Sequence, residues 1–307
     1  ELEYKPGRRL NTFYNSEVNI PTVNQILPVV NNINPLFIYY GNPDLIPEYN
    51  HEFNLHWWIF DQFTFTTLMT SINSGFTKDK INWSHTINDN LLQTSTLVNT
   101  DQEFNLGGNV DYSTAITKLG IKINADIEES WNTGINYVNT IENKNSNRSH
   151  RFYFSAENRK KNKWDIISGI GYNLTHSRYS IQKSLNRDYS DLSWFGEIRY
   201  NPTEKWNFEL TADVTNYSSK GFNETVNIPL LGAEMSYYFL KHNRGVLSIS
   251  CFDLLDKNTL VQRTSELNYL REIQSNTIGR YIMISFKYRL NKFGEQGGGI
   301  DVDIKRR

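Results

Sequence analysis

Hydrophobic and polar residues alternate with a period of two along most of this chain, and helical periodicity is nearly absent. The clearest example is the last patterned segment. One of its faces carries Ile282, Ile284, Phe286, Tyr288 and Leu290, and the other carries Tyr281, Met283, Ser285, Lys287 and Arg289. Because successive side chains of a strand point to opposite faces, this pattern predicts an all-β protein with one apolar and one polar sheet face.

The same division recurs upstream. Four further apolar rows consist of Phe104, Leu106, Gly108, Val110 and Tyr112; Leu119, Ile121, Ile123, Ala125 and Ile127; Trp164, Ile166, Ser168, Ile170, Tyr172 and Leu174; and Trp206, Phe208, Leu210, Ala212 and Val214. Segments near residues 10–20 and 63–72 are weakly patterned. Together the segments predict about twelve strands in an antiparallel, up-and-down order.

Short and long connections alternate between these segments. Short ones lie at residues 61–62, 114–118, 158–163, 201–205 and 241–244, and long polar ones lie near residues 80–92, 130–148, 179–187, 218–226 and 256–278. Two architectures share such a pattern. A soluble sandwich or barrel buries its apolar face, whereas a transmembrane β-barrel turns its apolar face to lipid and lines its lumen with polar residues.

Several features favour the transmembrane barrel over the soluble sheet. The alternating connections are typical of outer-membrane barrels, and the clear strands reach about ten residues, the span of a tilted transmembrane strand. Aromatic residues also gather where strands meet the short turns, as in an interfacial girdle: Trp57, Trp164, Tyr200, Trp206, Tyr237 and Phe239. The apolar rows carry no charge between their ends, while Glu209, Asp213 and Lys287 occupy the opposite face.

Composition narrows the class of protein further. The chain has 307 residues, 32 Lys+Arg against 33 Asp+Glu, and a mean hydropathy of −0.57. Near-balanced charge gives no sign of a nucleic-acid partner. No stretch is apolar for long enough to predict a transmembrane helix. The single cysteine, Cys251, excludes an intrachain disulfide.

The stretch "GNPDLIPEYNHEFNL", residues 41–55, resembles the GNP-x-L-x-PE segment of TonB-dependent outer-membrane transporters. The matching positions are Gly41, Asn42, Pro43, Leu45, Pro47 and Glu48. In that family an outer loop re-enters the barrel here. The two prolines restrict the residues before them, so we expect a stiff, extended lead into the strand that follows.

Downstream segments extend the resemblance to the C-terminal half of such a barrel. Residues 248–263, "SISCFDLLDKNTLVQR", are similar to the penultimate strand and its exit, and "RYIMISFKYRLNKFG" is similar to the closing strand. The many asparagine and aromatic residues look most like transporter-type barrels of Bacteroidetes. We expect residues 1–293 to form one barrel domain, followed by a Gly-rich periplasmic tail at 294–307.

The sequence also departs from the family pattern. Barrels of this family have 22 strands, and the plug domain, the TonB-contacting segment and the first strands have no counterpart here. We therefore expect the chain to be the C-terminal part of a longer protein. A shorter barrel with similar motifs is the alternative.

Chemistry-bearing motifs are not found. No G-x-S-x-G, H-E-x-x-H, P-loop or paired-cysteine spacing occurs, and the six histidines are scattered. We therefore expect no enzyme, no cofactor and no metal site. Candidate ligand-facing residues lie instead in the predicted long loops: Trp83, His85, Trp131, Tyr137, Tyr179, Tyr269 and Arg271. Packing among the loops, or contact with lipopolysaccharide, explains any one of them equally well.

Two functional hypotheses follow from the resemblance. The first is TonB-dependent uptake of a bulky nutrient across the bacterial outer membrane, with these residues forming the barrel wall and outer loops. The second is a transporter-like barrel that acts as a structural subunit of an outer-membrane complex. The expected partners are the bilayer and its lipopolysaccharide, a TonB complex acting through a plug, and a surface lipoprotein or larger assembly.

Overall fold

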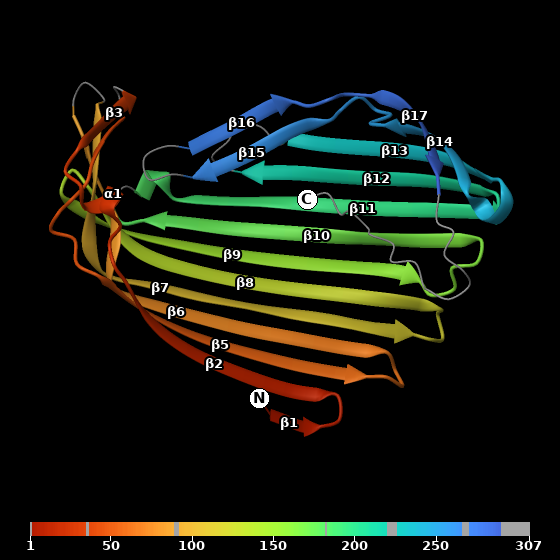
Figure 1. Cartoon of the computed structure of the whole chain (residues 1–307), viewed down its shortest axis with the longest axis horizontal. Helices are drawn as coiled ribbons and strands as arrows, with labels where there is room; N and C mark the ends of the chain where they lie inside the picture. The colour runs from red at the N-terminus through yellow and green to blue at the C-terminus, as the bar shows by residue number, and fades with distance from the viewer. Residues whose placement is uncertain are drawn as a thin grey trace.

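One broad antiparallel sheet makes up almost all of the structure, a computed structural model (Figure 1). It describes residues 2–34, 37–88, 92–181, 183–219, 226–265 and 270–289. The strands are β1 (Leu2–Lys5), β2 (Arg8–Asn19), β3 (Val30–Asn34), β4 (Phe37–Tyr40), β5 (Glu48–Asp61), β6 (Thr66–Ile87), β7 (Gln93–Ile116), β8 (Ile121–Val138), β9 (Ile141–Asn158), β10 (Trp164–Tyr179), β11 (Arg187–Thr203), β12 (Trp206–Ser219), β13 (Val226–Phe239), β14 (Gly245–Phe252), β15 (Thr259–Ser265), β16 (Leu270–Asn276) and β17 (Tyr281–Tyr288). Helix α1 spans Val23–Ile26, and short 3₁₀ turns span Lys183–Leu185 and Lys241–Asn243.

The strands pair in chain order, each antiparallel to the last. Within the described residues the order is β1-β2-β5-β6-β7-β8-β9-β10-β11-β12-β13-β14-β17, with β3 and β4 beside it and β15–β16 forming a separate hairpin. Apart from the four-residue β1, this path agrees with the predicted number of strands. The up-and-down order is therefore confirmed. The edges at β1 and β17 are not joined to each other in the part of the chain described, so the sheet is an open section of barrel wall.

Neither face of this sheet is covered by a second layer. Among the described residues the buried hydrophobic side chains are Leu45, Leu97, Tyr179, Ile228 and Val246. The accessible surface is 21346 Å² for a 35.9 kDa chain, whereas a compact soluble monomer of that mass exposes about 13,000 Å². A soluble sandwich is therefore excluded, because such a fold requires a packed apolar interior.

The predicted apolar rows remain exposed on one face. Phe208 is 38% exposed and Ile284 is 71% exposed. Apolar residues stand opposite apolar residues on the neighbouring strands: Leu210 lies opposite Ile198 of β11 and Ala233 of β13. An apolar surface of this extent suits a lipid environment. None of the helices among the described residues is long and apolar enough to cross a membrane.

Aromatic side chains form a belt near the short turns, as the sequence predicts. The rings of Trp164 and Tyr200 stack with centroids 4.2 Å apart, and those of Trp206 and Tyr237 lie 4.7 Å apart. Phe239 continues the belt toward β17. Amphipathic rings prefer the boundary between lipid and water. The belt therefore lies where the periplasmic boundary is expected if the sheet belongs to an outer-membrane barrel, because such barrels have their short turns on that side.

The predicted long connections are wrong at three places. Residues 80–92 belong mostly to the β6–β7 hairpin, and residues 130–148 belong to a β8–β9 hairpin closed by a turn at Asn139–Thr140. Part of 256–278 is the β15–β16 hairpin. Beyond the apolar rows both faces of these extensions can meet water, so neither face has to be apolar. Their polarity therefore resembles that of a loop although their backbones form regular ladders.

Candidate functional site

A row of polar side chains crosses the face opposite the apolar rows. Directly opposite one another on successive strands from β6 to β11 stand Ser71, Asn109, Glu128, Arg151, Asn173 and Asp191. Arg151 donates to Glu128 at 2.8 Å and to Asn173 at 3.1 Å, and Asn173 donates to Asp191 at 2.6 Å. The row is continuous in register, and its hydrogen-bonded part from Glu128 to Asp191 gives the polar face a surface suited to water.

The motif that begins at Gly41 forms a compact latch at the outer end of the sheet. Gly41 is buried against the loop around α1, and a Cβ atom there would lie 2.3 Å from the carbonyl oxygen of Leu27. Asn42 donates its side-chain amide to the carbonyl of Leu97 at 2.9 Å. Leu45 is buried, while Pro43 is exposed in the turn. The motif therefore fixes the outer loop onto the β6–β7 hairpin.

Two further residues secure this latch. The buried carboxylate of Glu48 accepts the backbone N–H of Ile81 at 2.6 Å and lies 3.3 Å from the ammonium of Lys80. Asn99 accepts the N–H of Ile46 at 2.9 Å and donates to the carbonyls of Ile46 at 3.0 Å and Asp79 at 2.6 Å. The loop and the hairpin thus share hydrogen bonds that neither could satisfy alone.

The structure brings some of the predicted ligand-facing residues together. Trp83 and His85 lie on β6, where their rings stack with centroids 5.7 Å apart, and Tyr39 meets Trp83 edge-on. Tyr137 on β8 pairs with Ser84, between them. These residues lie on strands, so their assignment to loops was wrong.

The other predicted residues are dispersed. Tyr179 ends β10 and is buried. Trp131 lies on β8 in the continuation of the apolar row, away from the polar face. Arg271 lies on β16, and Tyr269 lies outside the described residues. The predicted set is thus not a single site.

Acidification is expected to loosen the tip of the β6–β7 hairpin through His85. Gln93 Nε2 donates to Nδ1 of His85 at 3.1 Å, so this nitrogen is an acceptor in the neutral ring. Burial lowers the pKa of His85 from its ordinary value of 6.5. The unfolded chain therefore takes up the proton more readily, and the stability of the tip falls as the pH drops below about 6.5.

Amide hydrogen exchange over residues 80–100 at pH 7.5 and 5.0 checks this expectation. After division by the intrinsic exchange rate at each pH, the protection of the tip amides should be lower at pH 5.0 than at pH 7.5 in the wild type, and this difference should vanish in His85→Asn. An equal loss of protection in His85→Asn would exclude His85 as the titrating group.

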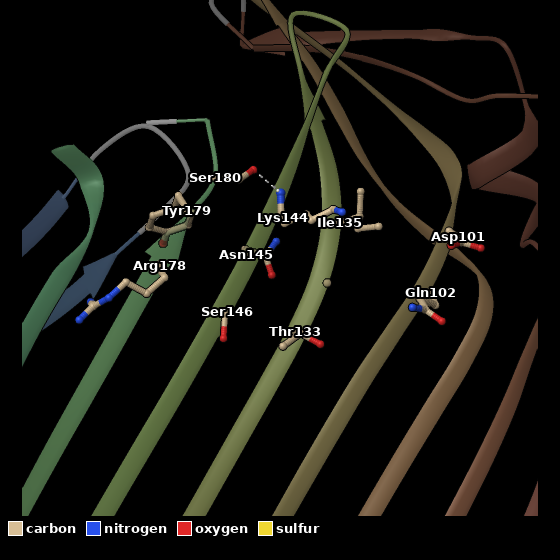
Figure 2. A pocket seen from close by; sticks show the side chains of 11 residues that line it. Asp101, Gln102, Thr133, Ile135, Lys144, Asn145, Ser146, Arg178, Tyr179 and Ser180 are labelled. Atoms are coloured by element: carbon tan, nitrogen blue, oxygen red, sulfur yellow. Dashed lines mark hydrogen bonds between the residues drawn. The ribbon is translucent and has the colours of Figure 1, made fainter. Parts of the chain in front are cut away.

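Strands β7 and β8 are paired over most of β8 and separate toward their outer ends. The two strands pair from Ile116↔Ile121 up to Phe104↔Thr133, and beyond this point the β6–β7 hairpin turns so that Ser84 of β6 pairs with Tyr137 of β8. Figure 2 shows the two ribbons diverging. A hollow of about 480 Å³ lies at the split, lined by Asp101, Gln102, Thr133, Gly134, Ile135, Lys144, Asn145, Ser146, Arg178, Tyr179 and Ser180.

This hollow offers mixed hydrogen-bonding chemistry. Lys144, Arg178 and Asp101 carry charge, and amides and hydroxyls stand between them (Figure 2). The outer connection is held by the N–H of Lys144, which donates to the hydroxyl of Ser180 at 2.8 Å. Such a surface can hold a polar solute such as a sugar or peptide. Among the described residues no cluster of three or more potential metal ligands occurs.

Sequence patterns did not indicate this hollow. Its lining comes from four strands, and it exists because two strands that pair near the membrane separate outside it. Gly134 is the only local hint, since its missing side chain leaves room beside Asn145. A lone glycine in a strand indicates a close approach or bulge without saying which.

Comparison with protein families shows to which family this chain belongs. The model of the outer membrane protein beta-barrel family matches residues 1–137 and 121–288, which is nearly the whole chain. The chain belongs to this family. Outer-membrane β-barrel proteins face lipid with their apolar rows, so the polar row around Arg151 borders the lumen. The protein is thus a β-barrel protein of the bacterial outer membrane.

Solved structures of outer-membrane proteins resemble this barrel protein distantly. OmpT (in-vitro folded), an outer membrane protein of Vibrio cholerae in its trimer form, aligns over 92% of this chain and 100% of its own, with 8% identity and a TM-score of 0.36. The siderophore receptor PirA from Acinetobacter baumannii aligns over 78% of this chain and 50% of its own, with 10% identity and a TM-score of 0.36. Neither likeness adds to the family assignment. No curated protein matches the chain.

Proposed function

We propose that this chain forms part of the wall and outer mouth of a TonB-dependent transporter that takes up a bulky nutrient. The observation that carries the proposal is the lumenal wall. Its polar row runs across six strands, and the apolar rows behind it face lipid. A wall with water-compatible chemistry and no packed interior suits a wide lumen, whereas small barrels fill their interior with side chains.

The latch supports the same proposal. The residues that match the transporter motif are those that hold the outer loop in place, with Gly41, Leu45 and Glu48 buried. Outer loops of a transporter must hold a defined shape to receive a solute. The hollow beside Asp101 lies at the outer end of the wall and supplies amide, hydroxyl and charged groups for a polar solute.

Further strands are part of this proposal. The edge strands β1 and β17 carry backbone groups that lipid cannot satisfy, and the described residues do not pair them with each other. We propose that they are joined by additional strands of a barrel of about 22 strands.

Depletion of solutes from the growth medium tests uptake whatever the chemical identity of the solute. Cells that contain the full-length protein are compared with cells that lack its gene, each with and without a protonophore. Uptake predicts a bulky solute that only the first strain removes, and removal should stop when the proton gradient collapses. Identical media from both strains would contradict transport.

The same cells also distinguish the alternative function, a structural subunit of an outer-membrane complex. The full-length protein is extracted in detergent, and its co-purifying proteins are identified by mass spectrometry. Loss of a stoichiometric complex in the deletion strain, together with unchanged solute depletion, would favour the structural function over transport.

A further inference from the structure

Above the apolar rows, the lipid-facing surface changes to charged residues. On β8 the row runs from Ile127 to Glu129 and Trp131, and on β9 its cross-strand partners are Phe152, His150 and Arg148. On the next strands His176 lies opposite Arg148 and Asp188. These residues lie toward the outer ends of the strands, so this change marks the outer boundary of the hydrocarbon region.

A second hollow lies at this boundary. Its volume is about 440 Å³, and most of its exposed lining is apolar. It is lined by Ile72, Leu106, Gly107, Gly108, Glu129, Ser130, Trp131, Arg148 and His150. Gly108 contributes to the depression because it adds no side chain to this face, whereas Gly107 points to the opposite face, toward Asn73. The hollow is therefore an apolar recess with a polar upper rim.

Trp131 is held rigidly in that rim. Its indole N–H donates to the hydroxyl of Ser146 at 3.1 Å, and the ring of Phe104 packs edge-on against it at 5.6 Å. The guanidinium carbon of Arg148 lies over the indole ring, 4.8 Å from its centroid. Stacking on a fixed aromatic face positions the guanidinium while leaving its N–H groups available.

Arg148 differs from the other cationic groups of this boundary. Arg178 forms an ion pair with Asp188 at 2.5 Å, and His150 interacts with Glu129. Within the part of the chain that the structure describes, Arg148 has no carboxylate partner. The planar guanidinium of an arginine in this position can donate two parallel N–H hydrogen bonds to one phosphate group.

We propose that Arg148, stacked on Trp131, binds a phosphate of a lipid A molecule in the outer leaflet, and that an acyl chain of this lipid lies in the hollow at Gly107–Gly108. The phosphates of such a lipid lie at the level where the lipid-facing surface becomes charged. The acyl chain covers Ile72 and Leu106, whose side chains are 41% and 38% exposed. The site depends on the lipid-facing orientation of this face and is independent of transport.

Native mass spectrometry of the delipidated full-length protein, titrated with bisphosphorylated lipid A, tests this site. Arg148→Gln is expected to weaken binding about tenfold, the effect of losing one charge-assisted contact. Arg148→Lys keeps the positive charge but lacks the paired N–H donors of the guanidinium, so it should bind lipid A with intermediate affinity. Trp131→Leu removes the stacking surface and should also weaken binding.

Arg151→Gln is the matched control, because Arg151 lies on the same strand but faces the lumen, where it contacts Glu128. This variant should bind lipid A as the wild type does, and lipid A without phosphates should bind the wild type as weakly as intact lipid A binds Arg148→Gln. Equal binding by wild type and Arg148→Gln would overturn the proposal. So would an equal loss in Arg151→Gln, or equal competition by phosphatidylglycerol or inorganic phosphate.

Discussion

Leu210→Arg is expected to destabilise the folded barrel by roughly 2–4 kcal/mol, the cost of a cation on the lipid face near the bilayer midplane. Leu210 lies in the middle of the apolar row of β12 from Trp206 to Val214, is 43% exposed, and has Ile198 and Ala233 as its cross-strand neighbours. None of these side chains can pair with a guanidinium. The charge would therefore face acyl chains on every side.

Thr211→Arg provides the matched control, because it places the same side chain one residue further along β12. Thr211 lies opposite Glu197 and Gly232 on the lumenal face. There the guanidinium has water, a carboxylate and free space, so we expect less than about 1 kcal/mol of destabilisation. Equilibrium denaturant titrations of the full-length protein in lipid vesicles measure both effects. A larger loss for Thr211→Arg than for Leu210→Arg would reverse the assignment of the two faces.

Asn99→Ala is expected to release the outer loop from the β6–β7 hairpin. The substitution removes three hydrogen bonds, two to the backbone of Ile46 and one to the carbonyl of Asp79. Groups left without a partner cost about 1–3 kcal/mol each where water cannot reach them, and less where it can. Because β5 and the membrane-spanning strands do not depend on these bonds, the effect should remain local.

Limited proteolysis and amide hydrogen exchange measure this local opening. Residues 20–47 should exchange and be cleaved faster in Asn99→Ala, while strands β9 to β12 remain unchanged. Asn105→Ala removes an amide from the same strand, opposite Gly75, and should leave the loop protected. If both variants loosen the loop equally, or neither does, the latch does not depend on Asn99.

The architecture within the membrane could be predicted from sequence because each strand there meets two different solvents. Phe208 and Glu209 are adjacent in the chain, yet one faces lipid and the other faces the lumen. This contrast imposes the period of two and so makes the strands visible. The aromatic belt was predictable for a similar reason, since Trp164 and Tyr200 mark a boundary between solvents.

The strands beyond the membrane could not be recognised in this way. Between Asn132 and Asn147, above the boundary at Trp131 and Arg148, both faces meet water, so nothing restricts either face to apolar residues, and the polar sequence was interpreted as a loop. The turn at Asn139–Thr140 was the signal available, since both residues adopt positive φ there. Asn-Thr is a weaker hairpin signal than Asn-Gly.

The two hollows depend on relations between strands rather than on any one segment. Trp131 and Arg148 are separated by 17 positions, and only the register of β8 and β9 places one over the other. The hollow beside Asp101 similarly requires the divergence of β7 from β8. A single sequence does not reveal register where neither face is constrained.

The orientation of the sheet is tested most directly by cysteine accessibility along β12 in the full-length protein. Native Cys251 is first replaced (Cys251→Ser), and single cysteines are then introduced at alternate positions of β12. In intact outer membranes a hydrophilic maleimide should label Glu209→Cys and Asp213→Cys, which border the aqueous lumen, and should leave Phe208→Cys and Leu210→Cys unlabelled in lipid. Labelling of Phe208→Cys and Leu210→Cys with protection of Glu209→Cys and Asp213→Cys would contradict the account.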